Sequence, residues 1–209
     1  DERAEHVGSC SRDGTVVVRS LASNESSTRW YHRPVLAVEL EREYAARSRT
    51  VATGGLAGDF VLSLRGWLGS KDVVVHSGEG PVRAIACAAG SGLYAWANDA
   101  GVKVFDAARS RRVSYIERPL GAIPAERLRP HLRWEGAAEL LIGWGDCIKI
   151  GKLLTREASS GVGGASYYVE ITAVLQTDFY VCGLCGLSLR QDDRGEWQRD
   201  LLVLAYARE

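Results

Sequence analysis

Cysteine and histidine are the residue types here with the widest chemical range. Cys182 and Cys185 are separated by two residues, the spacing of half a zinc site or of a redox pair. A tetrahedral zinc site takes four ligands, and the sequence has no second pair of this kind. Residues three apart on an extended strand also point to opposite faces of a sheet. We therefore interpret both cysteines as structural and expect no bound metal.

The other reactive residues form no catalytic or cofactor-binding pattern. The histidines are His6, His32, His76 and His131, and none belongs to an HExxH or HxxxH pair. The sequence contains neither a GxSxG elbow nor a phosphate-binding GxxxxGK[ST] loop. The acidic pair Asp192-Asp193 lies in a polar stretch and is interpreted as a solvated loop tip. We expect no enzyme and no cofactor.

Composition narrows the class of protein further. Lys plus Arg and Asp plus Glu balance at 26 each, which argues against a general nucleic-acid binder. The five cysteines, odd in number and irregular in spacing, predict reduced thiols in a cytosolic compartment. No apolar run approaches the roughly 20 residues of a membrane-spanning helix. Because the chain starts at Asp1 and contains no Met, we expect an excerpt of a longer protein.

Short strands are the elements that would position these residues. Apolar runs bounded by turn residues predict strands over 6–11, 15–21, 35–40, 50–54, 60–64, 72–77, 82–87, 93–97, 102–105, 113–116, 131–134, 139–143, 147–154, 168–175, 180–187 and 201–206. The stretches 22–33, 65–71, 159–166 and 191–199 are rich in Gly, Ser or charge and are predicted to be surface loops. Two short segments, 40–49 and 125–129, could form turns between strands.

The strands recur with a period. The segments VATGG at 51–55, YAWAND at 94–99 and LLIGWGD at 140–146 are about 45 residues apart, the spacing of four-stranded propeller blades. The sequence thus predicts an all-β fold, a partial WD-repeat-like β-propeller over residues 1–209. We expect three complete four-stranded blades and two incomplete ones, at about 6–34 (partial), 35–77, 82–116, 131–175 and 180–206 (partial).

Several residues are predicted to shape turns and blades rather than to bind ligands. These are Asp13, Gly14, Gly54, Gly55, His76, Asp99, Gly101 and Asp146. The glycines of GGLAGD at 54–59 are expected to permit a tight hairpin, and His76 to hydrogen-bond within its blade. Trp67 and Leu68 are candidates for contact with a partner or a membrane interface. Alternatively, these two side chains fold back and cover the edge of their blade.

Longer strings make a family resemblance visible. The most specific are HSGEGPV at 76–82, AWANDAGVKV at 95–104 and IGWGD at 142–146. Others are SCSRDGTVVV at 9–18, RPVLAVEL at 33–40, TGGLAGDFVL at 53–62, RPHLRW at 129–134, QTDFYVCG at 176–183 and LLVLAY at 201–206. In this order they resemble the N-terminal propeller of the vacuolar protein sorting-associated protein 41 family, subunits of the HOPS vesicle-tethering complex.

The resemblance implies a non-catalytic tether between late endosomes, autophagosomes or coated carriers and the lysosome or vacuole. It implies other HOPS subunits and a small GTPase of the Rab or Arf-like class as partners. It places the protein in the cytoplasm, peripherally on late-endosomal and lysosomal or vacuolar membranes. The segment 65–71 is shorter than the membrane-sensing loop of fungal members, and 188–200 departs from the family pattern. An alternative is a propeller that recognises a peptide in its central channel, independently of membranes.

Overall fold

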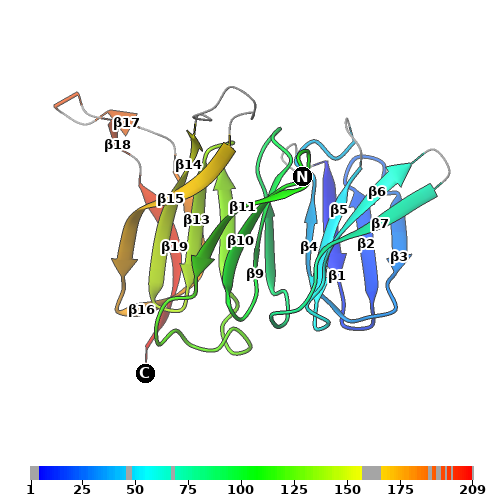
Figure 1. The fold of residues 1–209 in the computed structure, drawn as a ribbon, viewed down its shortest axis with the longest axis horizontal. Helices are drawn as coiled ribbons and strands as arrows, with labels where there is room; N and C mark the ends of the chain where they lie inside the picture. Colours follow the sequence, from blue (N-terminus) through cyan, green and yellow to red (C-terminus); the bar gives the residue numbers. More distant parts are fainter. Residues whose placement is uncertain are drawn as a thin grey trace.

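The computed structural model describes residues 5–45, 49–66, 69–156, 166–187, 190–191, 194–195, 197–198 and 200–208. Every regular element in these ranges is a β-strand (Figure 1). Nowhere in them is there a helix that could cross a bilayer. The all-β prediction is confirmed.

Three sheets have four antiparallel strands each, joined in sequence order. The first contains β4 (Val35–Leu40), β5 (Val51–Gly55), β6 (Phe60–Gly66) and β7 (Gly69–His76). The second contains β8 (Ala84–Cys87), β9 (Leu93–Ala97), β10 (Gly101–Asp106) and β11 (Arg111–Glu117). The third contains β12 (His131–Glu135), β13 (Glu139–Trp144), β14 (Cys147–Arg156) and β15 (Ser166–Gln176). Below we call these sheets blades 2, 3 and 4.

The sheet at the N-terminal end, blade 1, has three strands, β1 (His6–Cys10), β2 (Thr15–Ser20) and β3 (Ser26–Trp30). Strand β3 corrects the prediction of a surface loop over 22–33. Its sequence SSTRW is polar and mostly exposed, so it lacks the apolar alternation from which the other strands were predicted.

At the C-terminal end, blade 5, β16 (Phe179–Gly186) pairs with β19 (Leu201–Ala207). Between them the two-residue strands β17 (Arg190–Gln191) and β18 (Trp197–Gln198) form a separate small hairpin. This hairpin lies in the stretch 191–199 that was predicted to be a loop. The pair Asp192-Asp193 is outside the described residues.

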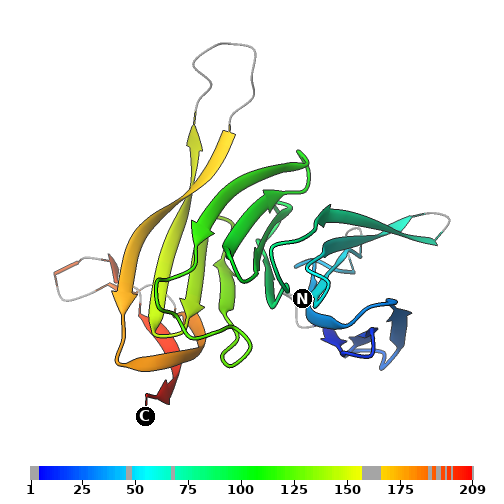
Figure 2. The ribbon, with the colours of Figure 1, turned by 60° about the horizontal axis from the view of Figure 1, so that its bottom comes forward.

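A second difference concerns the stretch 65–71, predicted to be a loop. Strands β6 and β7 extend into it and pair as far as Gly66 and Gly69. Figure 2 shows this hairpin and the β14–β15 hairpin projecting from the body of the molecule. Trp67 and Leu68 are outside the described residues, so their predicted contact stays a prediction.

At three of the blade junctions, between blades 1 and 2, 2 and 3, and 4 and 5, one backbone hydrogen bond recurs. In each case the amide near the start of a blade's innermost strand donates to a carbonyl at the second-to-third-strand turn of the preceding blade. The bonds are Val35 N to Ser11 O (3.2 Å), Val82 N to Gly55 O (3.0 Å) and Val181 N to Gly145 O (2.8 Å). By this bond β1 corresponds to β5 and β13, the second strands of their blades. Blade 1 therefore consists of second, third and fourth strands, and no strand of the described residues pairs with the inner edge of β1.

Apolar side chains fill the spaces between neighbouring blades. Between blades 2 and 3 the Phe60 and Trp96 rings stack at 4.4 Å and 11°. Between blades 3 and 4 the core contains Trp134 and Trp144, at most 1% exposed. Blade 3, which lies between these two cores, thus buries both of its faces, as propeller blades do.

Candidate functional site

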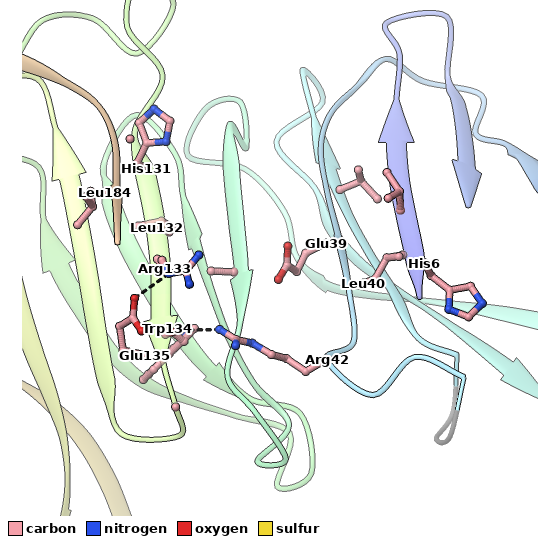
Figure 3. A pocket seen from close by; sticks show the side chains of 16 residues that line it. His6, Glu39, Leu40, Arg42, His131, Leu132, Arg133, Trp134, Glu135 and Leu184 are labelled. Atoms are coloured by element: carbon pink, nitrogen blue, oxygen red, sulfur yellow. Dashed lines mark hydrogen bonds and ion pairs between the residues drawn. The ribbon is translucent and has the colours of Figure 1, made fainter. Parts of the chain in front are cut away.

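A cavity lies where the innermost strands converge (Figure 3). It has a volume of about 820 Å³ and is lined from β4, β8, β12 and β16, with β1 at the open inner position of blade 1. Charged and imidazole side chains dominate its wall, namely His6, Glu39, Arg42, His131, Arg133 and Glu135. We refer to this cavity as the channel site.

Innermost strands pose a local problem, because one edge of each has no neighbouring strand to accept or donate hydrogen bonds. Charged side chains from blade 2 solve it for blade 3. Glu39 Oε1 accepts from Cys87 N at 3.3 Å, and Arg42 Nε donates to Cys87 O at 3.0 Å. The same guanidinium donates to Trp134 O on blade 4. Arg42 thus connects three consecutive blades (Figure 3).

A second arginine makes the mirror-image connection at the other end of these strands. Arg129 precedes β12 and donates to the carbonyls of Arg83, just before β8, and of Leu36, in β4. Arg42 therefore extends from blade 2 towards blade 4, and Arg129 from blade 4 towards blade 2. The two guanidiniums fix the relative positions of blades 2, 3 and 4 at both mouths of the channel.

The junction of blades 4 and 5 uses a carboxylate instead. Glu135 Oε1 accepts from Gly186 N at 2.9 Å and from Arg133 Nε at 2.7 Å. The Arg133 side chain is 50% exposed, whereas that of Glu135 is 12% exposed. Arg133 thus presents half of its surface to the channel site, and Glu135 is part of the blade junction.

Glu39 is the most perturbed acid of the channel site. Burial raises its pKa to about 7, because a carboxylate loses hydration there, while the Cys87 amide, Arg42 and Arg133 partly offset the shift. The native state therefore holds a proton on Glu39 up to near-neutral pH. Burial, together with Arg129, lowers the pKa of His131, which favours its neutral form.

We expect the free energy of unfolding of Glu39→Gln, compared with that of the wild type, to be higher at pH 8 than at pH 4. The raised pKa means that Glu39 favours folding below pH 4.5 and loses this contribution as pH rises through about 7. Glutamine keeps the acceptor for the Cys87 amide but does not ionise. The stability difference between variant and wild type should grow by up to about 3 kcal/mol across this window. Urea unfolding at several pH values measures it, and a pH-independent difference would contradict the assignment.

In the described ranges, the channel site included, no three or more His, Cys, Asp or Glu side chains gather as metal ligands would. Cys182 and Cys185 both lie on β16, are half-buried and form no disulfide. Burial raises the pKa of the Cys87 thiol to about 12, which keeps it protonated and unreactive.

Five of the residues predicted to shape turns lie at equivalent places, the second-to-third-strand turns of blades 1, 3 and 4. The Asp13 carboxylate accepts from Thr15 N at 2.8 Å, and Gly14 has a φ of 90°. Asp99 lies 3.8 Å from Arg83 Nε, and Gly101 begins β10 beneath the carbonyl of Ile116. The carboxylate of Asp146 pairs with Arg208 at 2.6 Å.

Gly54 and Gly55 have a different role from the predicted one. Both lie inside β5, and the positive φ of that hairpin belongs to Gly58, at 80°. A Cβ on Gly55 would lie 1.9 Å from the carbonyl oxygen of Pro34, and one on Gly54 2.3 Å from a methyl of Val82. These two glycines permit the close approach of neighbouring chain segments.

His76 pairs with Phe60 in its own blade and also contacts the next blade. Its ring lies 5.5 Å from the Trp96 ring of blade 3, and its Nε2 lies 3.7 Å from Glu79. Glu79 also pairs with Lys103, whose side chain is 4% exposed. Burial and then the Lys103 charge lower the pKa of His76. A hydrogen bond with the backbone of Gly78, just after β7, acts in the opposite direction and raises this pKa.

Sequence reasoning did not identify Glu39, Arg42, Arg129 or Glu135 as site residues. A signal was present for Glu39 alone, a carboxylate inside the apolar strand VLAVEL. The arginines occur in turns, where a charge is ordinary. Their partners are between 45 and 93 residues away along the chain, so no local pattern marks them.

These blades and their converging innermost strands define the class of protein as a WD-type β-propeller, and solved structures share this fold. Saccharomyces cerevisiae Sqt1 matches with a TM-score of 0.67 and 13% identity, over 96% of this chain and 53% of that one. The RRP9 WD40 repeats match with a TM-score of 0.55 and 12% identity, over 71% of this chain and 45% of that one.

Sequence comparison gives the particular family. The family model described as "Vps42 beta-propeller" matches residues 1–209. Vacuolar protein sorting-associated protein 41 homologs are 42% identical in Solanum lycopersicum over 88% of this chain and 32% identical in Homo sapiens over all of it. The chain belongs to the vacuolar protein sorting-associated protein 41 family. It spans about a fifth of the length of these relatives, 20% and 23%.

Proposed function

We propose that this propeller is a protein-binding scaffold module of the HOPS vesicle-tethering complex, in traffic from endosomes and autophagosomes to the lysosome or vacuole. The observation that carries the proposal is the family match over residues 1–209. Its partners would be other HOPS subunits and a small GTPase of the Rab or Arf-like class. It would act from the cytoplasm, peripherally on late-endosomal and lysosomal or vacuolar membranes.

The channel site supports a binding role rather than a catalytic one. Arg42, Arg129 and Glu135 are engaged by backbone groups of neighbouring blades, so their charges hold the ring instead of facing a substrate. A rigid surface lowers the entropic cost of binding a partner. We therefore propose no enzymatic activity for the chain.

Affinity purification of the full-length protein tests this proposal. We expect the wild type to enrich HOPS subunits and GTP-loaded vesicular GTPases, and a variant lacking residues 1–209 to lose part of this set. A partner set identical with and without residues 1–209 would contradict a binding role for the propeller. Turnover of a soluble substrate by the purified protein would contradict the non-catalytic assignment.

A second candidate is recognition of a peptide in the channel, without any link to membranes. The observation in its favour is the cavity of about 820 Å³ with charged walls. Half of the Arg133 side chain and the neutral His131 ring remain available there. Substitution Arg133→Glu would abolish binding of such a peptide but leave the HOPS partners bound.

A further inference from the structure

A second, smaller cavity lies at the junction of blades 1 and 2, away from the channel site. It has a volume of about 480 Å³ and is formed by the β1–β2 turn, the end of β3 and the segment between β3 and β4. Its lining includes Arg12, Trp30, Tyr31, His32 and Arg33. We call it the Trp30 recess.

The walls of the recess are held by hydrogen bonds before any ligand arrives. Tyr31 N donates to Gly14 O at 2.8 Å, which fixes the β1–β2 turn against the segment after β3. The Tyr31 hydroxyl lies 2.7 Å from Ser63 Oγ in blade 2. Arg33 pairs with Asp59 at 3.2 Å, again in blade 2. The recess is therefore preorganised, which reduces the entropic cost of binding.

Two side chains at this recess are not used by the fold. Trp30 is 70% exposed, a large apolar surface left in water. Arg12 is exposed, and no carboxylate of the described ranges lies within ion-pair distance of it. The nearby Asp13 carboxylate is occupied by its own turn, and its hydrogen bonds, chiefly from Thr15, lower its pKa. Tryptophan and arginine are the residue types enriched among the residues that dominate binding energy at interfaces.

From this geometry we infer that the Trp30 recess binds an extended segment of a partner protein with an acidic residue next to an apolar one. The apolar side chain packs on the Trp30 ring, and the carboxylate pairs with the Arg12 guanidinium. Charge complementarity selects an acid, because Arg12 and Arg33 lie at the opening and Asp59 neutralises only Arg33.

The shape of the surface favours a peptide over a lipid bilayer. A flat membrane cannot fill a recess, whereas an extended segment can. A membrane-bound basic site also needs several cations, since each adds only about 1 kcal/mol near an anionic surface. Arg33 is already paired with Asp59, which leaves Arg12 as the unpaired guanidinium of the recess, so a bilayer would gain little.

Selection of displayed random short peptides on the full-length protein tests the inference. We expect the recovered peptides to be enriched in Asp or Glu beside an aromatic or aliphatic residue. Trp30→Ala and Arg12→Glu should each weaken their binding by about tenfold or more, and Arg12→Lys by less. Leu120→Ala removes another fully exposed apolar side chain, in the β11–β12 connection, and should leave binding unchanged.

The outcomes separate the alternatives. Peptides without acidic enrichment, or binding that survives both Trp30→Ala and Arg12→Glu, would overturn the inference. So would Trp30-dependent sedimentation with phosphatidylserine vesicles in place of peptide binding, which indicates a membrane contact. Because Trp30 and Arg12 are exposed, an unchanged melting temperature should accompany each variant. Loss of peptide binding with HOPS partners retained would leave the proposed function intact.

Discussion

The substitution Gly14→Ala is expected to lower the free energy of unfolding by at least about 2 kcal/mol more than Gly78→Ala does. The two glycines have nearly the same backbone angle, with φ of 90° and 89°. A Cβ on Gly14 would lie 2.0 Å from the carbonyl oxygen of Tyr31, whereas one on Gly78 would meet nothing within 4 Å. Gly78→Ala should therefore show only the backbone strain, about 1–2 kcal/mol.

Urea unfolding of both variants measures this difference, with the slope checked for constancy. The pair is a matched control, since it separates the close approach of two chain segments from the strain of a positive φ. Equal losses of stability at the two sites would show that the segment after β3 moves away from the turn at little cost. The segments at the junction of blades 1 and 2 would then be held less rigidly than their hydrogen bonds indicate. The same would apply to the Trp30 recess.

The substitution Arg42→Ala is expected to lower the free energy of unfolding by about 2–4 kcal/mol, because it leaves the carbonyls of Cys87 and Trp134 without their donor. Arg42→Lys should fall between alanine and wild type, since an ammonium lacks the guanidinium fork that contacts both carbonyls. Arg133→Ala is the control. Its ion pair with Glu135 is half-exposed and should contribute no more than about 1 kcal/mol.

Chemical denaturation of the three variants, with hydrogen exchange of the β8 and β12 amides, measures this effect. We expect Arg42→Ala to accelerate exchange at the inner ends of blades 3 and 4 as well as in its own blade. Faster exchange confined to blade 2 would contradict the view that one side chain couples three blades. So would a loss in free energy of unfolding no larger than that of Arg133→Ala.

The strands of blades 2 to 4 could be predicted because each is an apolar run between turn residues. Leu93–Ala97 and Val35–Leu40 have the predicted bounds. Strand β3 was missed for a physical reason. It is the outermost strand of blade 1 and is mostly exposed. Because few of its side chains are buried, SSTRW has no apolar pattern.

Side-chain roles were harder to predict than strands. The turn residue Asp13 acts within two positions of itself, and its part in the turn follows from its chemistry. Gly55 appeared to serve its hairpin, but the oxygen it must avoid belongs to Pro34 in the preceding connection. His76 likewise meets Trp96 of the next blade. In both cases the decisive neighbour comes from outside the local hairpin.

The sequence by itself therefore determined the strands of blades 2 to 4, the blade repeat and the family, because these depend on residues close together in the chain. Only the tertiary structure decided which charged side chains meet. The ring brings the ends of β4, β8 and β12 together, so that Arg42 contacts Trp134 and Arg129 contacts Leu36 across more than 90 residues. The physical reason is that the unpaired edge of each innermost strand requires hydrogen-bond partners, and only the curvature of the ring supplies them.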